Sequence, residues 1–174
     1  MTAPSDLAHD GAGRLFYRGA RYLLVRPETL AALQKAVEAL AGDRAAACLV
    51  AGGRAGGGTA LRSLEGPADE VIARLLEMGG RLGWGAFALE RFTRDELVVT
   101  VSDSPFAAAY GPADGPVCHL ARGVLERLAE LAFGGPAAVR ETACAAAGAP
   151  RCRFEALPAA GHPRSAPVSR TPLQ

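Results

Sequence analysis

The 174-residue chain has few aromatic residues, one lysine and almost no net charge. Aromatic residues make up 6% of the sequence, and Lys35 is the lone lysine beside scattered arginines. With a formal net charge of +1 and no one-sided basic patch, the chain offers little to a phosphate backbone. We therefore expect no nucleic-acid partner.

The sequence also lacks a long apolar run. No segment approaches the roughly 20 apolar residues that a membrane helix needs, so we expect no membrane association. The first six residues show no basic start followed by an apolar stretch, which is the mark of a secretion signal. These features predict a cytoplasmic protein with reduced thiols, in which clustered cysteines indicate a metal or chemistry.

Hydrophobic periodicity alternates between helical and strand-like along the chain. The first predicted helix carries an apolar stripe of Leu30, Leu33, Val37 and Leu40. The glycine-rich segment 43–64 predicts a helix that is either broken or tightly packed at its glycines. The predicted elements are extended structure over 14–26, helices over 27–41, 43–64, 67–78 and 117–131, and hairpins over 86–101 and 138–157. This order predicts a single-domain α+β fold, with an antiparallel β-sheet packed against helices.

The two ends of the chain differ from the middle. Residues 1–13 show no periodic pattern, and we expect a flexible N-terminus. Residues 158–174 are rich in Pro, Ser, Ala and Arg and predict a disordered tail. Residues 14–157 remain as one folded domain.

Four side chains near the C-terminus are of the types that bind Zn²⁺: Cys118, Glu141, Cys144 and Cys152. Cys118 begins a predicted helix, and Cys144 and Cys152 lie across a predicted hairpin. Four protein ligands would close a tetrahedral structural site. The fourth cysteine, Cys48, lies in an apolar run and is interpreted as a small core residue.

The strand geometry sets a condition on this metal site. Glu141 and Cys144 are three residues apart, so an unbroken strand would direct them to opposite faces. A shared ion requires the strand to bulge or end near Ala143. The alternative is that the cysteines fill the core and that Glu141 pairs with an arginine such as Arg153.

No catalytic residue can be assigned. His119 follows Cys118 directly, and neighbours on a helix point in different directions, which argues against a Cys–His dyad. The glycines before Thr59 have the spacing of a phosphate-binding loop, but Gly58 stands where its lysine must be.

Several aromatic residues lie close to glycines in the second half of the chain. They are either ordinary core residues or the lining of a cavity for a flat, apolar molecule, and His119 could hydrogen-bond such a ligand. The candidate ligand-binding residues are Trp84, Phe87, Phe106, Tyr110 and His119.

Short motifs connect these residues to a known family: Gly83-Trp84-Gly85, Ser104-Pro105-Phe106, Pro116-Val117-Cys118-His119-Leu120, Glu141-Thr142-Ala143-Cys144 and Cys152-Arg153-Phe154. Over residues 14–157 the chain resembles the 4-vinyl-reductase domain family. It is also similar to the input domains of phenol- and xylene-sensing transcriptional activators, and more remotely to subunits of the TRAPP vesicle-tethering complex.

The resemblance implies a dimeric domain with an apolar pocket between sheet and helices. In the aromatic sensors three cysteines and a glutamate hold a structural zinc, and the four candidate ligands here have the same spacing. Those sensors hold the ligand hydroxyl through a histidine and a tryptophan upstream of the first zinc cysteine. Here Leu97 stands at or near the tryptophan position, and no histidine lies between His9 and His119. We therefore expect a ligand more apolar than phenol.

These features predict a stand-alone sensory domain that binds a small hydrophobic molecule and signals to a separate regulatory protein. Two alternatives remain open at this point. The resemblance also permits an accessory carrier or enzyme of bacteriochlorophyll biosynthesis, and it permits a purely structural dimerisation module. A zinc site closed by four protein ligands leaves no position for a substrate, so the chain need not be an enzyme.

Overall fold

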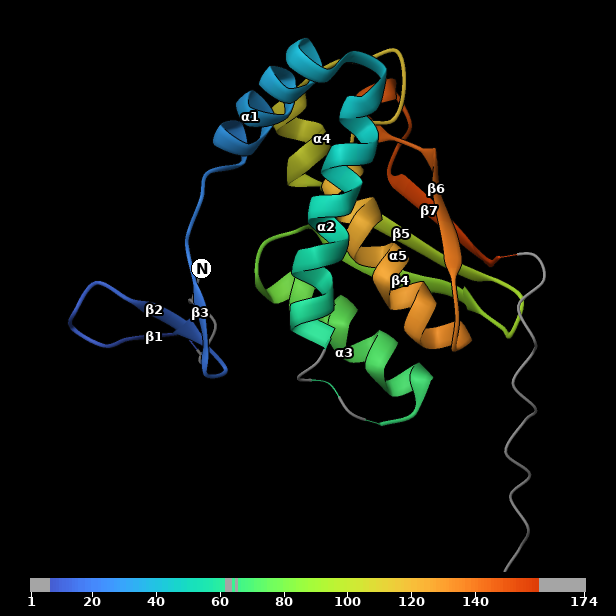
Figure 1. The fold of residues 1–174 in the computed structure, drawn as a ribbon, viewed down its shortest axis with the longest axis horizontal. Coiled ribbons are helices and arrows are strands. Elements are labelled where there is room, and N and C mark those ends of the chain that lie inside the picture. The colour runs from blue at the N-terminus through green and yellow to red at the C-terminus, as the bar shows by residue number, and fades with distance from the viewer. Residues whose placement is uncertain (1–6, 62–63, 65, 160–174) are drawn as a thin grey trace, which may run out of the picture.

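The computed structural model describes residues 7–61, 64 and 66–159 (Figure 1). Its strands are β1 (Leu7–His9), β2 (Leu15–Tyr17), β3 (Ala20–Tyr22), β4 (Ala86–Phe92), β5 (Leu97–Ser102), β6 (Ala137–Ala143) and β7 (Cys152–Pro158). Its helices are α1 (Pro27–Ala41), α2 (Ala45–Leu61), α3 (Ala68–Arg81), α4 (Pro105–Tyr110) and α5 (His119–Phe133), with short 3₁₀ helices η1 (Gly42–Arg44) and η2 (Ala145–Ala147).

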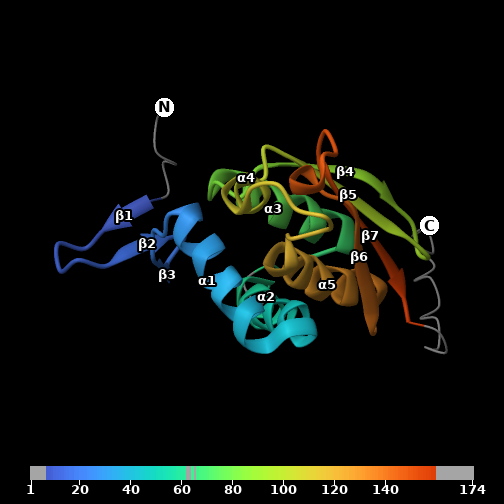
Figure 2. The same cartoon turned by 90° about the horizontal axis from the view of Figure 1, so that it is seen from above.

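The main sheet has four antiparallel strands in the order β4-β5-β7-β6. Helices α3 and α5 pack on one face of it, and α2 forms a further layer on α5 (Figure 2). The core between sheet and helices includes Val99, Val101, Leu128 and Phe154, all nearly inaccessible to solvent. The predicted single-domain α+β fold is therefore confirmed.

Helix α2 is continuous in spite of its glycines, because they bring it close to α5. A Cβ added at Gly53 would overlap the carbonyl oxygen of Leu120, and one at Gly57 would lie 3.0 Å from Cα of Val124. The glycine-rich segment is thus tightly packed and unbroken. Arg54 fixes the pair further through ion pairs to carboxylates of α5, at 3.0 Å from Glu126 and 2.5 Å from Glu130.

Strands β1, β2 and β3 form a separate antiparallel sheet. This N-terminal sheet projects from the body of the molecule and joins α1 through an extended linker (Figures 1 and 2). Strand β1 lies within the segment 1–13 that we expected to be flexible, because Leu7–His9 pair with β2. Of the predicted tail, Pro158 ends β7, and residues 160–174 lie outside the described residues.

Helix α1 presents an unexpected face to the body. Ala31 and Gln34 are its buried residues. Leu33 and Leu40, from the predicted apolar stripe, are 60% and 90% exposed. The expectation that the stripe packs on the core is therefore wrong within this single chain, because polar bonds dock the helix instead. Gln34 Nε2 donates to the carbonyl oxygen of Val117 at 2.9 Å.

Two further local expectations were wrong. Cys48 is exposed, because α2 meets α5 through its glycine face and Cys48 lies on another side. Helix α4 was not predicted, since its six residues are too few to show a period. Its start is fixed by Ser104, whose Oγ accepts a bond from Ala107 N, and by Pro105 in the first turn.

Candidate functional site

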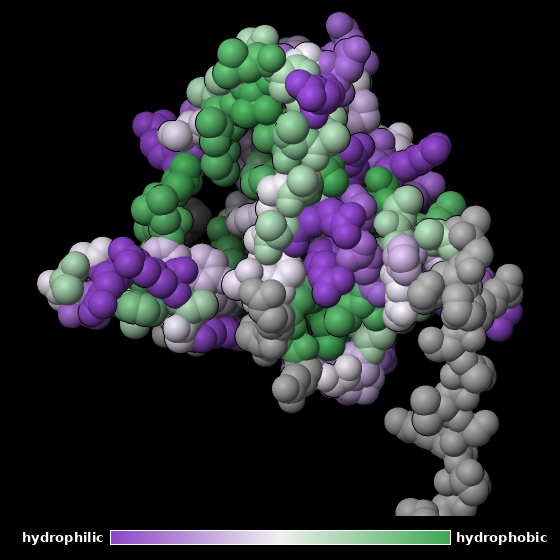
Figure 3. Space-filling view, in the orientation of Figure 1, coloured by the Kyte–Doolittle hydropathy of each residue, from purple (hydrophilic) through white to green (hydrophobic). Residues whose placement is uncertain are grey.

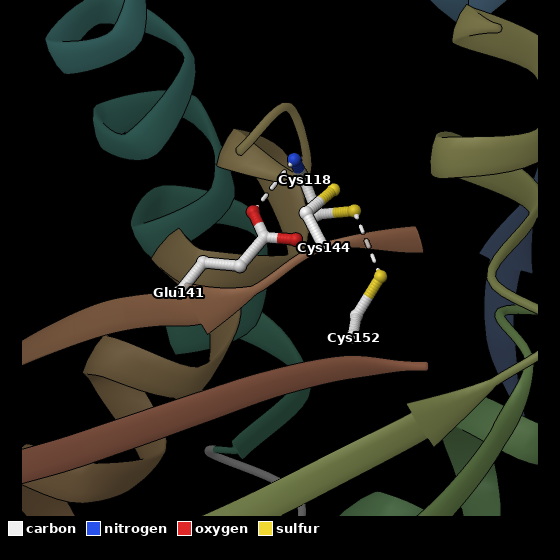
Figure 4. A group of neighbouring side chains, drawn as sticks. All are labelled: Cys118, Glu141, Cys144 and Cys152. Atoms are coloured by element: carbon white, nitrogen blue, oxygen red, sulfur yellow. Dashed lines mark hydrogen bonds between the residues drawn. The ribbon is translucent and has the colours of Figure 1, made fainter. Parts of the chain in front are cut away.

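The four predicted metal ligands meet at one buried corner (Figure 4). Cys118 is the residue before α5, Glu141 lies on β6, Cys144 directly follows β6, and Cys152 begins β7. One donor atom from each lies within 4.8 Å of all the others. All four cysteines of the chain are free thiols, and the three at this corner are buried.

A bulge in β6 allows this arrangement. Glu141 pairs with Phe154 and Ala143 pairs with Arg153, so the register shifts by one residue between them. The extra residue changes which face of the strand each later side chain meets. Glu141 and Cys144 consequently reach the same corner.

The spacing of the donors fits a tetrahedral ion. The Sγ atoms of Cys118 and Cys152 lie 3.7 Å apart. Two thiolates bound to one zinc at about 2.3 Å would lie about 3.8 Å apart. Glu141 Oε1 is buried and has no hydrogen-bond partner among the described residues, as expected of an atom that faces a cation. The residues therefore fit a metal ion held by three sulfurs and one carboxylate oxygen.

Backbone groups surround the corner with partial positive charge. The N–H of Cys118 donates to Glu141 Oε2 at 2.9 Å, so this carboxylate caps the start of α5. The N–H of Ala145 donates to Sγ of Cys152 at 3.4 Å. These donors favour anionic ligands, and the ring of protein groups leaves no open position.

The thiol pKa values reflect crowding of acidic groups. A hydrogen bond between the two thiols, with Cys118 as donor, raises the pKa of Cys118 and lowers the pKa of Cys152 to about 7. Burial, followed by the neighbouring Glu141 carboxylate, raises the pKa of Cys144 to about 11. Three thiolates and a carboxylate can coexist here only beside a cation.

A second feature is an apolar pocket of about 610 Å³ between the N-terminal sheet and the body (Figure 3). Its walls come from the linker after β3 and from helices α2, α3 and α5, together with the start of β4. Leucines line much of it, and Gly52 and Gly56 of α2 leave it open, since an added Cβ would meet nothing within 4 Å at either.

The predicted ligand-binding residues are distributed unevenly around this pocket. Trp84 and Phe87 line it. Phe106 packs edge-on against Trp84, with ring centroids 5.1 Å apart. Tyr110 lies elsewhere, where its hydroxyl donates to Glu38 Oε2 at 2.7 Å. His119 is half-buried beside the metal corner, where burial and then Arg122 lower its pKa.

Sequence reasoning missed most of the pocket lining. Leu23 and Leu24 of the linker, the α2 glycines and Arg81 were not among the candidates. Gly52 and Gly56 are four residues apart, as are Gly53 and Gly57. That spacing could have indicated a helix with one open and one close-packed glycine face.

Residues 97–158 match the model of the 4-vinyl-reductase domain family. A stretch of 46 residues is 54% identical to the bacteriochlorophyll synthase 23 kDa chain of Cereibacter sphaeroides, and it covers 26% of this chain and 22% of that relative. The chain thus spans less than a quarter of the curated relative that it matches.

Two solved structures are also similar. The phenol-responsive sensory domain of the transcription activator PoxR, solved with phenol, superposes with a TM-score of 0.77 over 88% of this chain and 85% of that one, at 18% identity. A vinyl-4-reductase family protein from Methanocaldococcus jannaschii gives a TM-score of 0.42 over 49% of this chain and 55% of that one, at 19% identity. The chain therefore has the fold of the PoxR sensory domain and resembles the 4-vinyl-reductase domain family over residues 97–158.

Proposed function

We propose that this protein is a cytoplasmic sensory domain that binds a small apolar molecule in the pocket beneath its N-terminal sheet. The pocket itself is the observation that carries the proposal. Its volume of about 610 Å³ lies within the usual range for ligand sites, and its lining is almost entirely apolar. The shared fold with a phenol-responsive domain supports a sensory role.

The lining also indicates the polarity of the ligand. Tyr22 contributes the one side-chain hydroxyl among the described residues of the pocket wall, and Trp84 contributes an indole N–H. A phenol needs a buried partner for its hydroxyl, whereas an aliphatic or polycyclic molecule needs chiefly apolar contact. We propose a ligand more apolar than phenol.

Fluorescence of Trp84, the single tryptophan, tests ligand binding directly. We expect titration with apolar aromatics and lipids to change its emission. Gly56→Leu should abolish the change, since its side chain would enter the pocket. Ala55→Leu is the matched control, because Ala55 is exposed on the same helix and does not line the pocket. Equal binding by both variants, or none by the wild type, would contradict the proposal.

We further propose that Cys118, Glu141, Cys144 and Cys152 hold a structural Zn²⁺. Support comes from the 3.7 Å sulfur separation and from the buried oxygen of Glu141 that lacks a partner among the described residues. When bound, zinc would supply charge balance and fold stability, and the closed ligand set argues against a catalytic role. Elemental analysis of protein purified without added metal should give about one zinc per chain. A clearly lower zinc content would count against this assignment.

We also propose that the protein acts as a homodimer and passes its signal to a separate regulatory protein. The apolar stripe of α1 supports dimerisation, because Leu33 and Leu40 lie exposed in a single chain. Leu23 and Leu24 of the linker are similarly exposed, at 81% and 75%. Such a cluster of exposed leucines is typical of a surface that another protein chain covers.

A second candidate function is a carrier of tetrapyrroles. The 54% identity to part of the bacteriochlorophyll synthase 23 kDa chain favours it. Titration with a chlorophyllide distinguishes the two functions, because a carrier should bind the pigment more tightly than any simple aromatic or lipid. Binding of lipids or aromatics without binding of the pigment would exclude the carrier.

A further inference from the structure

The pocket wall carries one charge. Among the described residues that line the pocket, Arg81 is the only ionised one. It lies in the last turn of α3, and its side chain is 41% exposed. The same helix contributes Leu75 and Leu76, which are buried. The wall along α3 therefore changes from apolar to cationic over six residues, or about 9 Å of helix.

A guanidinium at this place affects which ligand fits. A wholly apolar ligand would remove water from part of the cation without replacing its hydrogen bonds, which is unfavourable. A ligand with an acidic group would supply those bonds, and arginine binds carboxylates through two donors at once. The pocket thus favours a molecule with an apolar body and one anionic end.

The present partner of Arg81 can be exchanged. Its Nε and Nη2 lie 3.0 and 2.8 Å from the same oxygen, Oε1 of Glu77. Glu77 is one helical turn away, and its side chain is 53% exposed. Exposed pairs of this kind are weak because solvent screens them and both side chains lose freedom. A ligand carboxylate can therefore replace or join Glu77 at little cost.

From this geometry we infer that the ligand is an amphipathic organic acid, with its apolar body against the leucines of the pocket and its carboxylate at Arg81. The inference rests on the proposed ligand-binding function and narrows its substrate class. Helix α3 offers a matched control site. Arg74 forms the equivalent pair with Glu70, four residues earlier, at 3.5 Å, its side chain is 39% exposed, and it does not line the pocket.

Dodecanoate and 1-dodecanol, which have the same chain length, provide the test by Trp84 fluorescence below their solubility limits. We expect dodecanoate to bind at least about tenfold more tightly than dodecanol. Arg81→Gln should reduce this preference to about twofold or less while dodecanol binding stays unchanged. Arg74→Gln should keep the full preference for the acid.

Each outcome has one meaning. If the wild type binds both molecules equally, or if Arg81→Gln keeps the preference for the acid, the inference is overturned while the apolar pocket stands. Loss of the preference in Arg74→Gln as well would also overturn it, since the effect would then follow net charge. If neither these molecules nor any aromatic binds, the proposed ligand-binding function itself fails, and the acid inference fails with it.

Discussion

Glu141 is a buried carboxylate whose two oxygens have different surroundings. Oε2 accepts a hydrogen bond from the backbone N–H of Cys118, whereas Oε1 is buried and has no partner among the described residues. An unsatisfied buried acceptor costs about 1–3 kcal/mol, and more when it is charged. A metal ion beside Oε1 would remove this cost, which explains why the carboxylate is tolerated there.

Removal of one metal ligand should destabilise the whole domain. We expect Cys144→Ser to lose zinc and to lower the free energy of unfolding by about 4 kcal/mol or more, because a structural metal contributes folding energy. Cys48→Ser is the control: Cys48 is exposed, so its replacement should change stability by less than about 0.5 kcal/mol. Chemical denaturation and elemental analysis of both variants measure these effects. Full zinc content and unchanged stability in Cys144→Ser would refute the assignment of this ligand.

At the scale of elements, the crossing of α2 and α5 depends on glycines with opposite roles. Gly53 faces α5, where a Cβ would overlap the carbonyl oxygen of Leu120, whereas Gly52 faces open space. We expect Gly53→Ala to destabilise the protein by about 1–3 kcal/mol through overpacking. Gly52→Ala should stabilise it by about 0.5–1 kcal/mol through helix propensity. Urea denaturation compares the two, and similar effects of both substitutions would contradict the close packing.

Helix α1 is held partly by a titratable bond. The hydrogen bond to Glu38, followed by burial, raises the pKa of Tyr110 above its usual 10.0. A raised tyrosine pKa means that the bond contributes fully below about pH 10 and is lost as the pH rises through the folded-state pKa. Tyr110→Phe should therefore be less stable than the wild type by about 0.5–1 kcal/mol at neutral pH.

The pH dependence of this difference is the sharper measurement. Unfolding free energies of the wild type and Tyr110→Phe should differ by a constant amount up to about pH 10 and converge above it. Subtracting the variant removes the titration of the other tyrosines. A difference that grows in alkali would show that the bond to Glu38 does not hold the helix.

Long periodic elements could be predicted from the sequence, and short or shared ones could not. The apolar stripe of α3 and the alternation of β4 and β5 each bury one face, so their patterns specify them. Helix α4 spans only six residues. The orientation of α1 also escaped prediction, because its buried face is made of Ala31 and Gln34 and its leucines point outward.

The two candidate sites differ in the same way. The metal corner could be predicted, because Cys and Glu are scarce in buried positions and their donor chemistry is specific. Most of the pocket could not, because glycines such as Gly56 contribute space instead of side chains. Tyr22 and Leu23 are also far in sequence from the aromatic residues near Trp84, and only the fold brings them together.

At the scale of the whole molecule, the exposed leucines predict self-association. Light scattering during gel filtration should show a dimer for the wild type. Leu33→Glu combined with Leu40→Glu should give a folded monomer, because two charges cannot be buried in an apolar interface without partners. Ala39→Glu is the control, since Ala39 is exposed on α1 outside the stripe. A monomeric wild type at every concentration would refute the homodimer.

Helix α5 touches both candidate sites. Cys118 precedes its first turn, and Leu120, Ala121, Val124 and Leu125 line the pocket over the next two turns. If zinc fixes the position of this helix, any increase that zinc causes in the affinity for the pocket ligand must be matched by an equal increase that the ligand causes in the affinity for zinc. Saturation of the pocket should then slow the removal of zinc by a chelator, so metal exchange would report on occupancy more than a helical turn away.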